Sequence, residues 1–284
     1  MARLTVPEVQ AMKADGRKIV MLTAYDYPSA RLSEEAGVDV LLVGDSLGMV
    51  VLGYESTIPV TMEDMLHHTR PVVRGSERAL VVTDLPFMTY QASLDDAMRN
   101  AGRLIQEGGC QAVKLEGGVQ MAETVRRLVQ AGIPVVGHIG LTPQSINQVG
   151  RYRVQGTTAE AGERLIEDAV ALQQAGAFCI VLETIPARLA AIVSKRLRIP
   201  TIGIGAGADC DGQVLVWHEL LSYSTTYLPP HVPRHVKQYG NVGTEVRRAI
   251  EQYASEVRSG QFPTEKESFK ITREALAEIA KSAS

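Results

Sequence analysis

The sequence predicts an α/β fold, a (β/α)8 TIM barrel with a C-terminal helical extension, and two observations support this prediction. Eight short, apolar, β-branched runs alternate with helical stretches, as expected for strands buried on both faces of a parallel sheet. The chain has 284 residues, close to the roughly 250 residues of a typical single barrel. An open α/β sheet is the alternative, but eight consecutive β-then-α units favour the barrel.

The expected strands are Ile19–Tyr25, Val38–Val43, Leu80–Thr83, Ala112–Leu115, Ile133–Val136, Phe178–Leu182, Thr201–Ile204 and Val214–Trp217. Capping residues or acidic first turns mark the starts of three helices, Thr61–Arg74, Ser93–Glu107 and Thr158–Ala175. A glycine recurs before four strands, in Glu35-Ala-Gly-Val, Glu107-Gly-Gly-Cys, Gln130-Ala-Gly-Ile and Gln174-Ala-Gly-Ala. Each of these glycines is predicted to end a helix.

We expect a single domain over residues 1–284. Its last part, residues 240–284, contains two amphipathic patterns, Gly243–Ser259 and Thr272–Ala283. We expect these helices to pack on the barrel or on a neighbouring subunit. The segment Tyr223–Pro233 before them is a polar, proline-marked loop.

Composition excludes several classes of protein. The 29 basic and 32 acidic residues give a net charge of −3, without the basic excess of proteins that bind nucleic acid or anionic membranes. The three cysteines are far apart and form no CxxC motif, which argues against a zinc site and fits a reducing compartment. The N-terminus lacks the apolar segment of a secretory signal, and no apolar run approaches membrane-spanning length. We therefore expect a cytoplasmic enzyme with no nucleic-acid or membrane partner.

The candidate chemistry lies where the strands end, because barrel active sites form at the carboxyl ends of the strands. The first polar residues there are Asp26, Asp45 with Ser46, Asp84, Lys114 with Glu116, His138, Glu183 and His218. Ionised aspartates on neighbouring strand ends repel each other, and a divalent cation relieves this repulsion. Oxygen ligands suit Mg²⁺, so we expect Asp45 and Asp84 to bind one Mg²⁺, with Glu116 reaching it directly or through water. Such an ion could bind a 2-oxo acid and act as a Lewis acid.

Other roles stay open from position alone. Lys114 and Glu116 are two residues apart, so they face the same way; Lys114 could bind a substrate carboxylate, form a Schiff base, or pair with a nearby carboxylate. Glu183 ends an apolar strand and is either a general base or a helix-capping acid. His138 could support the metal ligands, form a hydrogen bond to the substrate, or be a purely structural histidine. The glycines in Gly203-Ile-Gly-Ala-Gly207 fit a phosphate-binding loop or a tight turn equally well.

Seven motifs in order resemble one family. They are Thr23-Ala-Tyr-Asp26, Gly44-Asp-Ser-Leu-Gly48, Pro59-Val-Thr-Met62, Thr83-Asp-Leu-Pro86, Val113-Lys-Leu-Glu-Gly117, Gly137-His-Ile-Gly-Leu-Thr-Pro-Gln144 and Gly203-Ile-Gly-Ala-Gly207. From about Ile19 to Trp217 the chain resembles the ketopantoate hydroxymethyltransferases, with a looser match to Phe269. The sequence departs from the family pattern at Arg151 and at Glu219.

This resemblance implies a (β/α)8 barrel that transfers a hydroxymethyl group from 5,10-methylenetetrahydrofolate to 3-methyl-2-oxobutanoate, giving 2-dehydropantoate. It implies one Mg²⁺ per subunit, with Asp45, Asp84 and Glu116 as ligands. It assigns substrate contacts to Asp45, Ser46, Asp84 and Lys114, and the proton acceptor to Glu183. It also implies a homodecamer or another homo-oligomer.

Two other functions remain possible from the sequence. One is a Mg²⁺-dependent carbon–carbon lyase or mutase of the phosphoenolpyruvate mutase/isocitrate lyase type. Those lyases usually carry a Lys-Lys-Cys-Gly-His segment, and none of the three cysteines here lies in one. The other is a barrel that binds ligands or assembles without catalysis, which the intact set of Asp45, Asp84, Glu116 and Glu183 argues against.

Overall fold

The computed structural model describes residues 2–223 and 232–282. Its centre is a closed barrel of eight strands in sequential order, each parallel to its neighbours. The strands are β1 (Ile19–Thr23), β2 (Val40–Val43), β3 (Leu80–Asp84), β4 (Ala112–Glu116), β5 (Val135–Gly140), β6 (Cys179–Glu183), β7 (Thr201–Ile204) and β8 (Gly212–Leu215). The predicted TIM barrel is confirmed.

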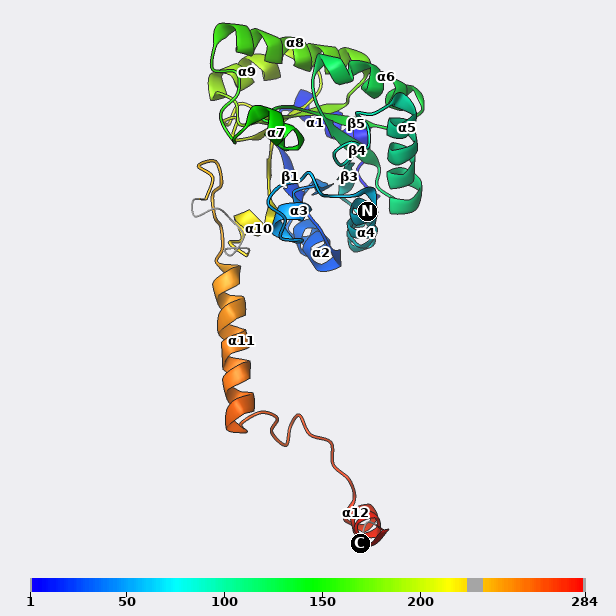
Figure 1. Ribbon diagram of the computed structural model, residues 1–284, viewed down its shortest axis with the longest axis vertical. Coiled ribbons are helices and arrows are strands. Elements are labelled where there is room, and N and C mark those ends of the chain that lie inside the picture. The colour runs from blue at the N-terminus through cyan, green and yellow to red at the C-terminus, as the bar shows by residue number, and fades with distance from the viewer. Residues whose placement is uncertain (1, 224–231, 283–284) are drawn as a thin grey trace.

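Helices surround the strands (Figure 1). They are α1 (Val6–Ala14), α2 (Tyr27–Glu35), α3 (Leu47–Val50), α4 (Met62–Gly75), α5 (Leu94–Arg103), α6 (Ala122–Gln130), α7 (Ile146–Val149), α8 (Ala159–Ala175), α9 (Ala187–Arg196) and α10 (Trp217–Leu220). Three short non-α turns also occur: a π-helical turn, η1 (Leu104–Gly108), and two 3₁₀ turns, η2 (Val119–Met121) and η3 (Pro143–Ser145).

Local signals in the sequence account for the helix ends. The side chains of Thr61, Ser93 and Thr158 each accept a hydrogen bond from a backbone N–H in the first turn of α4, α5 and α8, as predicted. The glycines of the four recurring phrases, Gly37, Gly109, Gly132 and Gly176, all have positive φ. This left-handed conformation is nearly free of steric cost only for glycine, so these residues end the helices.

The last strand lies two residues earlier than predicted. Strand β8 covers Gly212–Leu215, and Trp217 begins α10 instead of ending the strand. At Gly212 a Cβ would lie 2.4 Å from the carbonyl oxygen of Ile19 on β1. Closure of the barrel against β1 therefore requires a glycine at the start of β8, at a position that lies outside the predicted strand Val214–Trp217.

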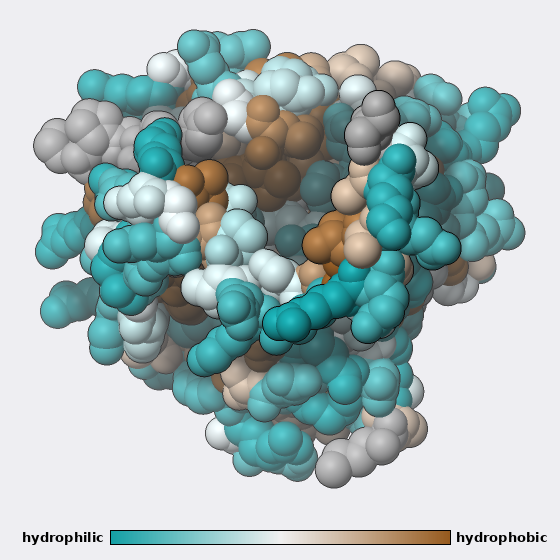
Figure 2. Space-filling view, turned by 90° about the horizontal axis from the view of Figure 1, so that it is seen from below, coloured by the Kyte–Doolittle hydropathy of each residue, from teal (hydrophilic) through white to brown (hydrophobic). Residues whose placement is uncertain are grey.

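Two buried layers hold the barrel together. A larger layer fills the space between strands and helices, and a smaller one fills the barrel interior. The interior layer includes Val9 and Met12 of α1, so this helix closes the amino-terminal end of the barrel. Seen from below, the surface of the molecule is hollowed near its centre, with hydrophobic residues around part of the hollow (Figure 2).

The C-terminal segment extends away from the barrel (Figure 1). It contains α11 (Val242–Ser259) and α12 (Arg273–Ser282), and neither helix has a buried residue. The apolar side chains of α11 lie on one side of the helix and are exposed: Val246, Ile250, Tyr253 and Val257. The amphipathic helices of the sequence therefore form, but within one chain they do not pack on the barrel. No helix of the described residues is both long and apolar enough to cross a membrane.

Candidate active site

Strand periodicity directs the charged residues into the barrel. On β3, Leu80 and Val82 belong to the interior layer, and successive side chains of a strand alternate between its faces. The next inward position is therefore Asp84. The same rule continues from Ala112 on β4 to Lys114 and Glu116. It continues from Val136 on β5 to His138, and from Val181 on β6 to Glu183.

The inward side chains form one connected, buried cluster. Lys114 Nζ lies 3.0 Å from Asp84 Oδ1 and 3.3 Å from His138 Nδ1. His138 Nδ1 lies 3.5 Å from Glu116 Oε1, and its Nε2 lies 3.1 Å from Glu183 Oε2. Glu183 is the most exposed member, with 16% of its side chain accessible. The cluster thus leads from the barrel interior to a carboxylate that substrate can reach.

Asp45 and Ser46 join the cluster from the loop after β2. The backbone N–H of Asp45 donates to Asp84 Oδ2 at 3.1 Å, and the Asp45 side chain is buried. Ser46 Oγ lies 2.8 Å from the hydroxyl of Tyr25, a fully buried residue that follows β1. The structure therefore brings together all of the predicted site residues: Asp45, Ser46, Asp84, Lys114, Glu116, His138 and Glu183.

Burial and repulsion between neighbouring carboxylates raise the pKa values of two acidic groups, Asp45 and Asp84. Burial raises the pKa of Asp45 well above its usual value, and the nearby Asp84 and Glu116 raise it further. Burial also raises the pKa of Asp84, although Lys114 opposes this shift. Asp84 Oδ1 has no aligned hydrogen bond within the described chain, despite its contact with Lys114. The acidic part of the cluster is therefore short of positive charge.

The basic groups stay charged. Burial lowers the pKa of Lys114, but Asp84, Glu116 and Asp45 outweigh this effect, so the pKa is raised. Burial and the Lys114 ammonium lower the pKa of His138, but contacts with Glu116 and Glu183 outweigh both and raise it to about 9. Of the alternatives for Lys114, the ion pair with Asp84 is present. A permanently charged ammonium does not favour Schiff-base formation.

The charges of the cluster leave room for a divalent cation. Four carboxylates, those of Asp45, Asp84, Glu116 and Glu183, face two cationic groups, Lys114 and His138. When all are ionised, the sum is −2. In the described ranges, no group of three or more acidic, histidine or cysteine side chains is arranged so that it could hold a metal ion. Mg²⁺ commonly binds through one or two carboxylates and keeps several waters, so it does not require such a group.

Two buried residues of the site were not singled out in the sequence. Gln144, after β5, donates from Nε2 to Asp45 Oδ2 at 2.9 Å, and its backbone N–H donates to Glu116 Oε2 at 3.0 Å. Tyr90, after β3, donates its hydroxyl proton to Gln144 Oε1 at 2.7 Å. Gln144 ends one of the motifs quoted above, which was the available signal; Tyr90 lies in none of them.

Other strand-end residues have different surroundings. Asp26 accepts a bond from Ser29 N and caps α2. His218 packs among the rings of Tyr25, Trp217 and Tyr223. The expectation that both converge with the carboxylates is not supported by their contacts. In the glycine-rich segment after β7, the His235 ring packs on Gly205. Of the predicted loop Tyr223–Pro233, residues 224–231 lie outside the described residues.

Comparison with known proteins identifies the family. Residues 3–265 match the ketopantoate hydroxymethyltransferase family. The chain is 58% identical over 279 residues to the 3-methyl-2-oxobutanoate hydroxymethyltransferase of Carboxydothermus hydrogenoformans, covering 98% of this chain and 100% of that protein. It is 57% identical over 275 residues to the protein of the same name from Chloroflexus aurantiacus, covering 97% and 96%.

Solved structures share the fold at low sequence identity. A phosphonopyruvate hydrolase complex with oxalate and Mg²⁺ aligns with a TM-score of 0.60 and 11% identity, over 99% of this chain and 96% of that chain. A phosphoenolpyruvate phosphomutase from Streptomyces platensis subsp. rosaceus aligns with a TM-score of 0.59 and 14% identity, over 98% of each chain. At these identities the likeness concerns the barrel only. The family match and the identity over nearly the whole chain show that this protein belongs to the ketopantoate hydroxymethyltransferase family.

Proposed function

We propose that this chain transfers a hydroxymethyl group from 5,10-methylenetetrahydrofolate to 3-methyl-2-oxobutanoate, giving 2-dehydropantoate for pantothenate synthesis. The observation that carries the proposal is the buried cluster itself: carboxylates, a lysine and a histidine meet at the carboxyl end of the barrel, and Glu183 lies at its accessible edge. Family membership and the names of the relatives support the same reaction.

Mg²⁺ fits the residues of this site. Asp45, Asp84 and Glu116 would hold it, directly or through water, because they supply oxygen ligands in a buried region with an excess of negative charge. When bound, Mg²⁺ supplies a Lewis acid that polarises the keto group of the substrate. The unaligned Asp84 Oδ1 is an acceptor available for this purpose.

The other side chains of the site bind the substrate and remove its proton. Lys114 and the Ser46 hydroxyl bind and orient the keto acid, with Asp45 and Asp84 also contacting it. Glu183 removes the single proton on C3, which leaves a carbon nucleophile. That carbon attacks the methylene carbon of the folate, which is bonded to two folate nitrogens. One of these carbon–nitrogen bonds breaks as the carbon–carbon bond forms, and the other breaks when water supplies the hydroxyl oxygen. The two nitrogens take up the proton from C3 and the proton released by water. His138 Nε2 lies 3.1 Å from Glu183 Oε2 and, when protonated, would stabilise the ionised carboxylate.

The assembled enzyme is proposed to be a homo-oligomer, a homodecamer by resemblance to the family. In the single chain the apolar side chains of α11 are exposed, and the helix extends away from its own barrel (Figure 1). A second copy of the chain would bury it. Light scattering of the purified protein tests this: a monomer at micromolar concentration would contradict it.

The test of the reaction is Glu183→Gln. The amide keeps the size of the side chain and an acceptor for His138, but it cannot take a proton. We expect keto-acid affinity within a few-fold of wild type and loss of C3 deuterium exchange in heavy water by at least about 100-fold. Proton NMR of the C3 signal measures the exchange. The control is Glu163→Gln, the same substitution on the exposed surface of α8, which should leave the exchange rate unchanged.

The outcomes separate the alternatives. Exchange at the wild-type rate in Glu183→Gln would remove Glu183 as the base. Wild-type protein that releases product only when the folate is present supports the transferase. Cleavage of a hydroxy acid without folate would instead indicate the lyase alternative.

A further inference from the structure

Gln144 connects two carboxylates of the site, one through its side chain and the other through its backbone. Its Nε2 donates to Asp45 Oδ2 and to the carbonyl oxygen of Leu85, both at 2.9 Å. Its backbone N–H donates to Glu116 Oε2 at 3.0 Å. Gln144 is 4% exposed, so water does not compete for these bonds. A single residue after β5 therefore sets the positions of carboxylates that follow β2 and end β4.

Tyr90 determines which way the Gln144 amide faces. The Tyr90 hydroxyl oxygen accepts from the backbone N–H of Glu116 at 3.0 Å. Its one proton has two acceptors within reach, Gln144 Oε1 at 2.7 Å and the Glu116 carbonyl oxygen at 3.2 Å, and the shorter contact is with Gln144. Gln91 Nε2 donates to the same oxygen at 3.1 Å. With Oε1 held by two donors, the NH₂ group must face Asp45. A reversed amide would place two acceptors against each other.

This arrangement compensates for the repulsion between the acids. A neutral amide donates to Asp45 without adding a positive charge that would repel a cation. A lysine in its place would satisfy Asp45 but would compete with Mg²⁺ for it. The amide thus leaves the negative charge of the site intact while it restricts the rotation of the carboxylate.

We propose that Gln144, held by Tyr90, is a positioning residue that fixes the Asp45 and Glu116 carboxylates and thereby sets the affinity of the site for a divalent cation. The proposal rests on the proposed function, because it takes these carboxylates as metal ligands. Partners of metal ligands typically change metal affinity 10- to 100-fold when they are removed.

The test measures Mn²⁺ binding to the full-length protein by electron paramagnetic resonance, without turnover. In Gln144→Met, which keeps the length of the side chain but lacks the amide, we expect the Kd for Mn²⁺ to rise about 10- to 100-fold. In Tyr90→Phe the amide remains but loses the shorter of the two bonds to Oε1, and we expect a rise of about 10-fold. The control is Gln130→Met, the same substitution at an exposed position at the end of α6; its Kd should stay within about threefold of wild type.

A second readout separates positioning from general damage. Because the proposed defect is in affinity, saturating Mg²⁺ should return kcat of Gln144→Met toward the wild-type value; a misfolded variant would not recover. Should Gln144→Met fail to fold, Tyr90→Phe decides alone, and an unchanged Kd there overturns the proposal.

The remaining outcomes distinguish the two levels of inference. A wild-type Kd in Gln144→Met, or an equal loss of affinity in Gln130→Met, overturns the role of Gln144 and leaves the proposed function standing. Wild-type protein that binds no Mn²⁺ overturns the metal site of the proposed function, and the inference fails with it.

Discussion

Gly140→Ala should destabilise the barrel and also disturb Glu183, the carboxylate proposed as the base. Gly140 ends β5 with φ +97°, and a Cβ there would lie 2.2 Å from the carbonyl oxygen of Glu183 and 2.9 Å from Ile185 Cγ2. The left-handed conformation costs a non-glycine residue about 1–2 kcal/mol, and the overpacking adds about 1–3 kcal/mol. We expect a total of about 2–5 kcal/mol. Glu183 must also move, because its carbonyl accepts from Leu141 N at 2.9 Å.

Gly132→Ala is the matched control. Gly132 has φ +85° and nothing within 4 Å of its added Cβ, so it has the backbone strain without the collision. The difference between the variants is thus the overpacking alone, about 1–3 kcal/mol, or roughly 2–6 °C in Tm for a chain of this size. Calorimetry at one protein concentration gives Tm, and C3 exchange gives the effect on Glu183. Equal Tm and equal exchange rates in the two variants would refute the reasoning.

Two further predictions concern residues around the cluster. Tyr25→Phe removes the hydroxyl that holds Ser46, so we expect KM for the keto acid to rise about 2- to 10-fold with little change in kcat. Tyr27→Phe, on an exposed side chain, is the control. An unchanged KM in Tyr25→Phe would contradict the role of Ser46 in binding. Burial and the nearby Glu183 raise the pKa of Glu219 to about 7, above its unfolded value of about 4.5. Stability should therefore fall as pH rises from about 4.5 through 7, by at most about 3 kcal/mol. Glu219→Gln should raise Tm relative to wild type at pH 8 and change it little at pH 4.5, and the same difference at both pH values would refute the assignment.

Period-2 alternation made most of the barrel and much of the site predictable. The run Leu80–Thr83 predicts a strand, and its alternation continues to Asp84 as an inward residue. The same reasoning placed Lys114 and Glu116 on one face, as the structure confirms. The method works here because the inward face of a barrel strand changes from apolar in the middle to polar at one end, and the change is visible in the sequence.

Strand alternation does not predict the site residues that follow the strands. Tyr90 and Gln144 lie about 54 positions apart in loops after different strands, and their contact at 2.7 Å depends on barrel closure. No local pattern encodes such a contact. The C-terminal extension shows a related limit: spacing of Val246, Ile250 and Tyr253 predicts an apolar helix face, but periodicity does not reveal the surface that covers it.

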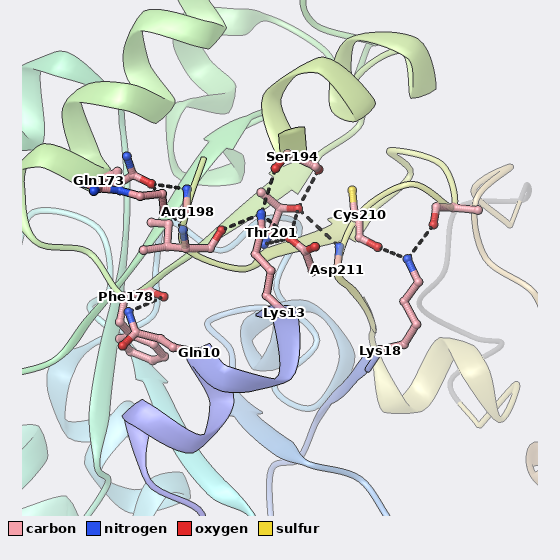
Figure 3. A network of polar contacts seen from close by, with 12 residues as sticks. Gln10, Lys13, Lys18, Gln173, Phe178, Ser194, Arg198, Thr201, Cys210 and Asp211 are labelled. Carbon is pink, nitrogen blue, oxygen red and sulfur yellow. Dashed lines mark hydrogen bonds and ion pairs between the residues drawn. The ribbon is translucent and has the colours of Figure 1, made fainter. Parts of the chain in front are cut away.

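The two ends of the barrel differ in how well their charges are satisfied, and this difference separates stability from function. At the amino-terminal end, Lys13 of α1 donates to the carbonyl oxygens of Ser194 and Ile199 and to Asp211 Oδ2, at 2.8–3.0 Å (Figure 3). These three acceptors match the three protons of an ammonium group. Asp211 also accepts from the backbone N–H and the hydroxyl of Thr201.

The carboxyl-terminal end has the opposite character. Asp45 is buried with its pKa raised by burial and by neighbouring carboxylates, and Asp84 Oδ1 lacks an aligned donor in the described chain. Under the proposed function this end binds a cation and an anionic substrate, and internal partners that satisfied its charges would compete with both ligands. Substitutions near Lys13 should therefore change Tm and leave KM unaltered, whereas neutral substitutions at Asp45 should weaken ligand binding without a comparable loss of stability. This asymmetry follows from the chain direction common to all eight strands, which brings every carboxyl end to one rim.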